Sequence, residues 1–298
     1  MDLLKQVGAF FGWLSGVVAG VTAALYALGF IATIARQGML GLEWAITSRE
    51  ALYYLGLGGQ VASRWAFLAT VWLLLVIAAG ETLLWTIRWV AGREHIRLRP
   101  VRKCAAWIDR QLIWLIAILA MLFAGLMMNA FDGALQVRGL LFASVGELCR
   151  SNGVLADLAG ANGNALAVRA DGVAGFAALA IGTCAYAVPR LVASHSPALP
   201  MLVCIAVAFQ AVAAIPTAHG IFLLDTRLRS TEAGGEGIEA LPAGDLWLVT
   251  RSRDGVWVWE PTAREVYWLA EGSFDRLRIG EARSIRSLAC GEGDFGLT

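Results

Sequence analysis

The sequence predicts an α-helical integral membrane protein with about five transmembrane helices and a small C-terminal antiparallel β-rich domain. Hydrophobic residues make up 58% of the 298 residues and charged residues only 16%, whereas soluble domains average roughly 45–50% and about 25%. The mean hydropathy is +0.64. The apolar stretches are long enough for membrane spans, and the pattern changes to short β-rich runs after residue 225. These observations exclude an ordinary soluble, fibrous or disordered protein.

The apolar stretches define the expected transmembrane domain, residues 1–224 with its outer loops. A hydrocarbon core of about 30 Å requires roughly 20 apolar residues of helix. The first stretch is longer than the apolar core of a signal peptide, about 7–15 residues, so we expect it to remain as a membrane anchor. The fourth stretch is the weakest, and its loss would move the C-terminal segment across the membrane. The expected spans are about residues 7–34, 65–90, 112–131, 173–192 and 199–224.

Basic residues predict the orientation. The segment 91–110 contains six Lys and Arg residues against two acids. An excess of short-loop Lys and Arg marks the cytoplasmic side of a membrane. The N-terminus then lies in the cytoplasm, while segments 36–64, 132–172 and the residues after 224 lie outside. For a bacterial chain this means a multi-pass protein of the inner membrane with a periplasmic C-terminal domain.

The segments outside the expected spans differ in character. In Arg36–Arg64 apolar and charged residues alternate irregularly, which predicts an interfacial helix or a pair of short helices. Ser151–Gly163 is rich in Gly, Asn and Ala and predicts a mobile loop. Thr231–Gly244 is rich in Gly and Glu and predicts a linker or long loop.

The C-terminal domain, residues 225–298, contains four short runs typical of strands, separated by turn signals. We predict an antiparallel meander of about four strands. In Val256–Glu260 the two Trp residues share one face and the two Val residues share the other. A free-standing meander would expose one face to water, so we expect cover on both faces from the outer loops, a neighbouring subunit or the membrane surface. The four runs are residues 245–250, 256–260, 264–269 and 274–279.

A ridge of small residues runs along the first expected span. Its glycines recur every four residues, and Ala24 continues the series. Such spacing lets another helix backbone approach closely. Glycine inside a helix costs about 1 kcal/mol relative to Ala, so close packing is needed to offset it. The partner is either another helix of the same chain or a neighbouring subunit. The helix-packing residues are Gly8, Gly12, Gly16 and Gly20.

Polar residues inside the expected spans are candidates for function. An intramembrane charge costs roughly 2.5–3.5 kcal/mol even on translocon scales, so Glu81 is a functional hypothesis. Alternatively, Glu81 pairs with Arg88 or is protonated and bonded to a neighbouring helix. Gln210 is more typical of hydrogen bonding between helices. Pro216 removes a backbone donor in the fifth span, which predicts a kink.

Two cysteines, Cys149 and Cys290, fall outside the expected spans on the oxidising side. Secreted segments with paired cysteines favour a disulfide. A bridge would tie the β-rich tail to the outer loop, whereas the alternative is two free buried thiols.

No catalytic, metal or cofactor motif accompanies these features. The three histidines are scattered, and the sequence contains no CxxC, GxSxG or P-loop pattern. The formal net charge of +1 does not favour nucleic acid as a partner. We therefore expect a non-enzymatic protein in contact with membrane lipid.

Two functions from different classes fit this sequence. The first is a homo-oligomeric channel or pore-type assembly with a periplasmic β-rich domain. The second is an accessory or scaffolding subunit of a larger membrane protein complex. A membrane enzyme or transporter would need a polar intramembrane cluster, for which only Glu81, Gln210 and Asn129 are available.

Overall fold

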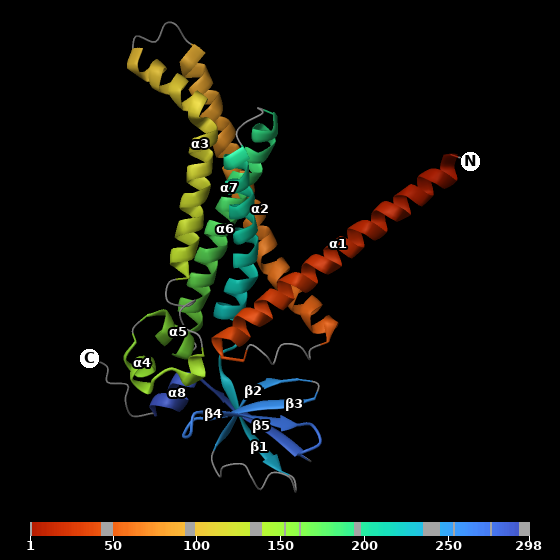
Figure 1. Ribbon diagram of the computed structural model, residues 1–298, viewed down its shortest axis with the longest axis vertical. Coiled ribbons are helices and arrows are strands. Elements are labelled where there is room, and N and C mark those ends of the chain that lie inside the picture. Colours follow the sequence, from red (N-terminus) through yellow and green to blue (C-terminus); the bar gives the residue numbers. More distant parts are fainter. Residues whose placement is uncertain are drawn as a thin grey trace. The chain divides into compact units, whose positions relative to one another are not determined.

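A computed structural model of the chain is 73% helical, with a small antiparallel sheet at the C-terminus (Figure 1). The chain divides into two compact units. Unit 1 comprises Met1–Gly59, Asp132–Val168 and His219–Thr298, and unit 2 comprises Gln60–Phe131 and Arg169–Ala218. The structure describes residues 2–42, 50–92, 99–131, 139–151, 153–160, 162–193, 198–234, 245–252, 254–274 and 276–291.

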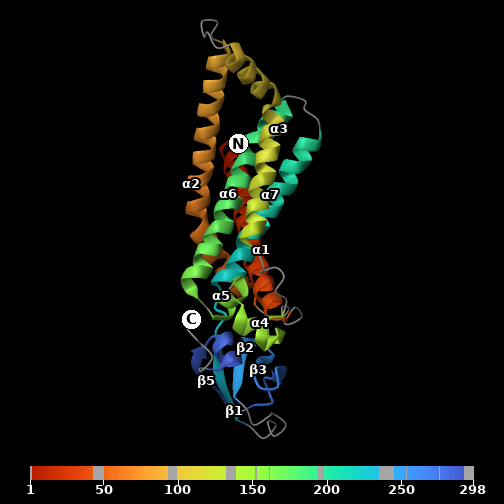
Figure 2. The same ribbon diagram turned by 90° about the vertical axis from the view of Figure 1, so that its left-hand side faces the viewer.

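Long helices form unit 2. They are α2 (Ala51–Gly92), α3 (Arg99–Ala130), α6 (Gly163–Ala193) and α7 (Ala198–Ala218), of which α2 and α6 begin in unit 1. Helix α3 runs alongside α7, as both views show (Figures 1 and 2). Helix α2 is continuous from Ala51, so no break separates the expected interfacial segment from the second expected span.

Four helices within the described residues are long and apolar enough to cross a membrane. Their apolar segments are Gly8–Met39, Ala51–Val90, Gly163–Ala187 and Ala198–Leu223. The third expected span corresponds to a shorter apolar segment, Trp114–Ala130 in α3. The weakest stretch is therefore the third expected span, about residues 112–131, rather than the fourth. The fourth gains length because its helix begins ten residues earlier than the apolar run, at Gly163.

Unit 1 begins with α1 (Asp2–Met39), which ends at a glycine cap. Gly41 has φ of +72°, a left-handed conformation that glycine adopts without a Cβ penalty. The Leu42 N–H donates to the Gln37 carbonyl at 2.9 Å, the bond that closes a helix through such a cap. The cap turns the chain so that Leu40 and Leu42 enter a hydrophobic core.

Helix α7 changes geometry shortly after Pro216. A π-helical turn, η4 (His219–Leu223), follows the last α-helical residue. Proline removes one backbone donor from the helix, and the wider turn accommodates the altered hydrogen-bond register. The helix therefore changes from α-helical to π-helical hydrogen bonding just after the position where a kink was expected, and the chain continues into the first strand.

In the described part of the chain, the sheet has five antiparallel strands in the order β4-β3-β2-β1-β5. The expected meander was incomplete, because β1 uses residues that the sequence assigned partly to a linker. The last strand was also misplaced, since β5 pairs with β1 and not with β4. The strands are β1 (Leu228–Gly234), β2 (Leu246–Arg251), β3 (Gly255–Glu260), β4 (Glu265–Ala270) and β5 (Arg276–Arg283).

Both faces of strand β3, which lies between β4 and β2, are buried, as its pattern predicted. Side chains alternate between faces along a strand, which places Trp257 and Trp259 on one face and Val256 and Val258 on the other. Residues of the segment 139–160 and the end of α1 cover the Trp face, so the expected loop cover is present on that face. The covering helices are η3 (Leu140–Phe142), α4 (Val145–Arg150), α5 (Val154–Gly160) and α8 (Ile285–Cys290).

Helix α5 corrects the expectation of a mobile loop over Ser151–Gly163. Its residues Val154, Ala156 and Leu158 are buried. Of its small residues, Ala156 and Ala159 are buried in unit 1. The Thr226 hydroxyl donates to the Leu158 carbonyl at 3.1 Å, which ties α5 to the strand entry.

Candidate functional site

The first helix crosses α2 at a pair of glycines. A Cβ built on Gly29 would meet the backbone of Tyr54, and a Cβ built on Gly58 would meet the backbone of Leu25. The two backbones are therefore in direct contact. Tyr26 and Phe30 pack edge to face on Tyr54, with ring centroids 5.2 and 5.6 Å apart. Sequence analysis missed this crossing because its two glycines lie on different helices.

The same stretch of α1 contacts the π-helical turn η4. A Cβ built on Gly220 would meet the backbone of Ala32, so the two helices also touch here. The Arg36 guanidinium donates to the carbonyl of Asp225 at 2.8 Å. Helix α1 is thus fixed within unit 1 by α2 and by η4, next to the sheet.

Gln37 is a buried polar residue that sequence analysis did not single out. It is 1% exposed, and within the described residues neither Oε1 nor Nε2 has a hydrogen-bond partner. Leaving a buried polar group unsatisfied costs about 1–3 kcal/mol. Gln37 lies five residues after Ala32, in the part of α1 that contacts η4. No motif surrounds Gln37, so sequence analysis had no reason to single it out.

The four predicted glycines of the ridge lie elsewhere on α1 and have open surroundings. A Cβ built on Gly8, Gly12, Gly16 or Gly20 would have no neighbour within 4 Å among the described residues. The nine residues from Gly20 to Gly29 correspond to about two and a half helical turns. Gly20 therefore faces away from the side of α1 that crosses α2, and the ridge turns by about 40° with each four-residue step toward Gly8.

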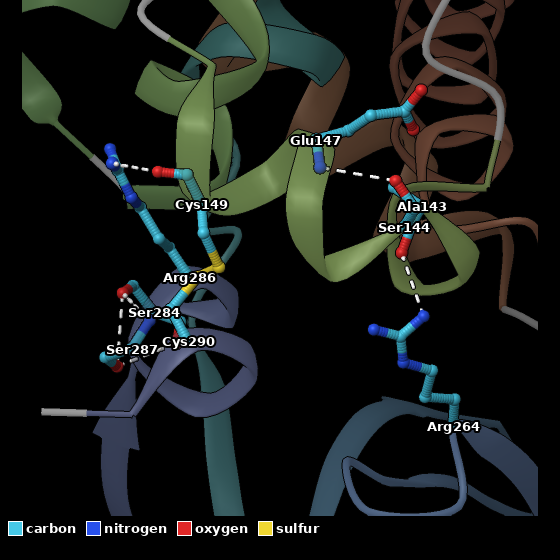
Figure 3. Close-up of a disulfide and its surroundings, with 9 residues drawn as sticks. All are labelled: Ala143, Ser144, Glu147, Cys149, Arg264, Ser284, Arg286, Ser287 and Cys290. Carbon is cyan, nitrogen blue, oxygen red and sulfur yellow. Dashed lines mark hydrogen bonds between the residues drawn. A yellow bond between two sulfur atoms is a disulfide. The ribbon is translucent and has the colours of Figure 1, made fainter. Parts of the chain in front are cut away.

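The structure joins Cys149 of α4 to Cys290 of α8 in a disulfide, with Cα atoms 5.9 Å apart. That Cα separation lies within the range that a disulfide can bridge. The Arg286 guanidinium donates to the Cys149 carbonyl at 3.2 Å, beside the bridge (Figure 3). The bridge fastens α8, which follows the last strand, to α4, which covers the Trp face of the sheet.

Both helices of the bridge begin at a serine cap. The Ser144 hydroxyl accepts a hydrogen bond from the Glu147 N–H at 3.2 Å, and the Ser284 hydroxyl accepts one from the Ser287 N–H at 3.1 Å (Figure 3). Such caps satisfy amides that a helix leaves without partners. The Arg264 guanidinium reaches the Ala143 carbonyl at 3.5 Å, so the sheet also contacts the start of α4.

The two polar residues predicted inside spans lie on the surface of unit 2. Glu81 is exposed on α2, and Gln210 is exposed on α7. Neither residue lines the cleft of this unit. Hydrogen bonding of Gln210 to another helix stays a prediction.

A cleft of about 280 Å³ lies between α2, α3 and α6 of unit 2. Apolar side chains from three helices line it, including Leu83, Leu119 and Phe123. Thr183 and Tyr186 of α6 also border it. The Thr183 hydroxyl donates to the Leu179 carbonyl at 2.7 Å, within its own helix. The cleft therefore suits an apolar occupant.

Two further cysteines meet inside unit 2. Cys184 of α6 and Cys204 of α7 are buried, and their side chains are hydrogen-bonded to each other. The sequence showed only that each lies within an expected span. Sequence spacing could not show that they meet, because the contact depends on how α6 packs against α7.

Among the described residues, no group of three or more His, Cys, Asp or Glu side chains could hold a metal ion. The features of the described residues that could serve a function are therefore helix-packing surfaces, the disulfide and the apolar cleft. Comparison of the chain with protein-family models, with curated proteins and with solved structures finds no match.

Proposed function

We propose that the protein is a homo-oligomeric membrane protein of the channel or pore type, without enzymatic activity. In this proposal α1 and unit 2 lie in the inner membrane of a bacterial cell. The sheet and its covering helices lie in the periplasm. The observation that carries the proposal is the open small-residue face of α1.

The exposed part of α1 has two chemically different faces. At 100° per residue, small side chains occupy one side and bulky apolar side chains occupy the other. All of these residues are exposed. The small face consists of Gly8, Ala9, Gly12, Ser15, Gly16, Ala19, Gly20 and Ala23, and the bulky face includes Phe10, Trp13, Leu14, Val17, Val18 and Val21.

These two faces complement each other between copies of the chain. The small face of one helix lets the bulky face of the next approach closely, which is a major source of helix association in lipid. A contact between two different faces is heterologous, and repeated heterologous contacts form a ring when the rotation between successive copies closes. A ring of α1 helices has a central axis, which is the architecture of a pore.

The core of unit 1 supports five membrane crossings. Leu42, Leu140 and Leu228 are buried in the same hydrophobic cluster, so they lie on the same side of any membrane. An even number of crossings must then separate Leu42 from Leu140. If α2 crosses the membrane, α3 must cross as well, although its described apolar segment is shorter. Leu140 and Leu228 must likewise be separated by an even number of crossings, so α6 and α7 either both cross or both do not.

The disulfide supports the periplasmic placement of this core. Disulfides persist in oxidising compartments and are rare in the cytosol. Cys149 and Cys290 join two segments of the cluster that contains Leu42 and Leu140. The basic segment 91–110, at the other end of α2, then lies in the cytoplasm, as its charge favours.

The oligomer is tested by the mass of the detergent-extracted protein, measured by native mass spectrometry. Gly12→Leu and Gly16→Leu should each lower the oligomeric mass, because a leucine holds the neighbouring helix away. Gly125→Leu is the matched control, since Gly125 is also exposed in an apolar helix and a Cβ there meets nothing within 4 Å. A monomeric wild-type protein, or variants that all keep the wild-type mass, would contradict the proposal.

The pore is tested separately by ion flux into vesicles that contain the purified protein. If Glu81 borders the conducting path, Glu81→Gln should lower flux while the oligomeric mass stays unchanged. Thr82→Val is the control, because it removes a polar group one residue away without changing charge. If the protein forms a ring but conducts no ions, the pore function is rejected and the homo-oligomer alone stands.

A second function, an accessory or scaffolding subunit of a larger complex, is favoured by strand β5. This strand ends the sheet, and its residues are exposed along almost its whole length. An exposed edge strand can pair with a strand of another protein. Gentle extraction followed by cross-linking should then recover a different protein in fixed stoichiometry, attached through residues 276–283. Recovery of this chain alone would reject the accessory role.

A further inference from the structure

The cleft of unit 2 owes its shape to two consecutive small residues on α2. Ala79 and Gly80 both line it, between larger apolar side chains of the same helix. A Cβ built on Gly80 would lie 3.1 Å from the Tyr186 ring, so this ring packs directly on the helix backbone. The missing side chains leave a volume of about 280 Å³, near the lower end of small-molecule sites, about 300 Å³.

The cleft is accessible from the surface of unit 2. Leu83 and Leu119 line it and are 58% and 41% exposed. In a membrane these surfaces face hydrocarbon, so an occupant enters sideways from the bilayer. An apolar chain satisfies this lining, because a polar ligand would lose its hydrogen bonds with water.

Basic residues lie toward one end of the cleft, beyond Glu81 of α2. Arg88 is exposed on α2, eight residues beyond Gly80 and hence about 12 Å along the helix. Lys103 is exposed near the start of α3, which begins at the same end of the unit. At the opposite end, Arg64 is balanced by Asp171 at 3.8 Å.

We propose that this cleft binds one acyl chain of an anionic phospholipid, whose headgroup phosphate lies against Arg88 and Lys103. The apolar lining holds the chain, and the two cations select the headgroup. Basic residues near a membrane surface attract anionic lipids at about 1 kcal/mol each. The proposal requires α2 and α3 to lie in a membrane, but it does not depend on oligomerisation or conduction.

Native mass spectrometry tests occupancy after exchange into detergent with phosphatidylglycerol or with phosphatidylcholine of the same chain length. We expect about one phosphatidylglycerol per chain to remain bound. Ala79→Phe should abolish this binding by filling the cleft. Ala78→Phe is the matched control, because Ala78 is the neighbouring exposed alanine and does not line the cleft. Equal loss in both variants, or no retained lipid in the wild type, would overturn the proposal.

Headgroup selection is tested with Arg88→Gln and Lys103→Gln. Each should lower the preference for phosphatidylglycerol over phosphatidylcholine about fivefold, while Arg64→Gln should leave it unchanged. Equal retention of both lipids by the wild type would overturn the anionic selectivity. The same spectra report the oligomeric mass. If the protein is a monomer that retains lipid, the proposed oligomer is wrong but the proposed lipid site stands.

Discussion

Gly29 of α1 and Gly58 of α2 hold the two helices in backbone contact. Gly29 lies against the backbone of Tyr54, one turn before Gly58, and Gly58 lies against the backbone of Leu25, one turn before Gly29. A Cβ at either position would meet main-chain atoms of the opposite helix. Main-chain atoms cannot move aside as the end of a flexible side chain can. The crossing fixes α1 next to the cluster that covers the sheet.

Gly29→Ala should therefore destabilise the protein, by about 1–3 kcal/mol as over-packing typically does. Gly58→Ala should have the same effect, and the double variant should cost less than the sum because both substitutions separate the same helices. Thermal unfolding in detergent measures the change. Gly16→Ala is the control, because a Cβ at Gly16 has no neighbour within 4 Å. Equal stability of all these variants would show that the crossing does not hold α1.

The bridge between Cys149 and Cys290 spans 141 residues of sequence. On the chain-entropy model, a loop of that length is stabilised by about 4–5 kcal/mol, although measured values often run lower. Cys149→Ser with Cys290→Ser should lower the unfolding temperature of unit 1. Cys104→Ser is the control, because Cys104 is an exposed free thiol. A non-reduced digest of fresh membranes should yield the linked peptide, and recovery of two free thiols would reject the bridge.

The long helices could be predicted from the sequence because their apolar runs are continuous. The sheet could be predicted only in part. Strands β2, β3 and β4 carry dense aromatic and β-branched residues, whereas β1 contains Arg229, Ser230 and Glu232 and closely resembles a polar linker. Its strand conformation comes from pairing with β2 and β5 on its two sides. Such pairing is tertiary, so a local pattern cannot reveal it.

The glycines illustrate the same limit for the candidate sites. Regular spacing drew attention to Gly12 and Gly16, which touch nothing among the described residues, and not to Gly29, which touches another backbone. A packing glycine is recognised by its partner, and the partner of Gly29 lies on a different helix. The cleft was also hidden, because Ala79 and Gly80 form a hollow only beside Tyr186.

Tyr267 on β4 should ionise at a higher pH than an ordinary tyrosine. Its hydroxyl donates to a Glu265 carboxylate oxygen at 2.5 Å, and this bond is the main cause that raises the pKa of Tyr267 from 10.0 to about 12. Because the folded pKa is raised, the contact stabilises the fold fully below about pH 10 and is lost as the pH rises through about 12. Difference absorbance between the wild type and Tyr267→Phe measures this titration.

Glu265→Gln is the matched test of that cause. It keeps the size of the side chain but removes the negative charge, so the pKa of Tyr267 should move back toward 10.0. If the wild-type tyrosine already ionises near pH 10, the hydrogen bond does not form in solution.

The proposed five crossings can be tested by accessibility from the two sides of the membrane. Leu42, Leu140 and Leu228 share one core, so the proposal expects cysteines placed in 43–49, 132–138 and 235–244 to be accessible from one side. It expects cysteines placed in the basic segment 93–98 to be accessible from the other side. Single cysteines placed in these segments, in a background without the native free thiols, should react accordingly with a membrane-impermeant maleimide added to intact cells.

Labelling in 43–49 and 235–244 without labelling in 132–138 would mean that α3 does not cross, and the shared core would then have to be wrong. Labelling in 93–98 alone would keep the five crossings but invert the protein, placing the disulfide in the cytosol, where reduction would be expected.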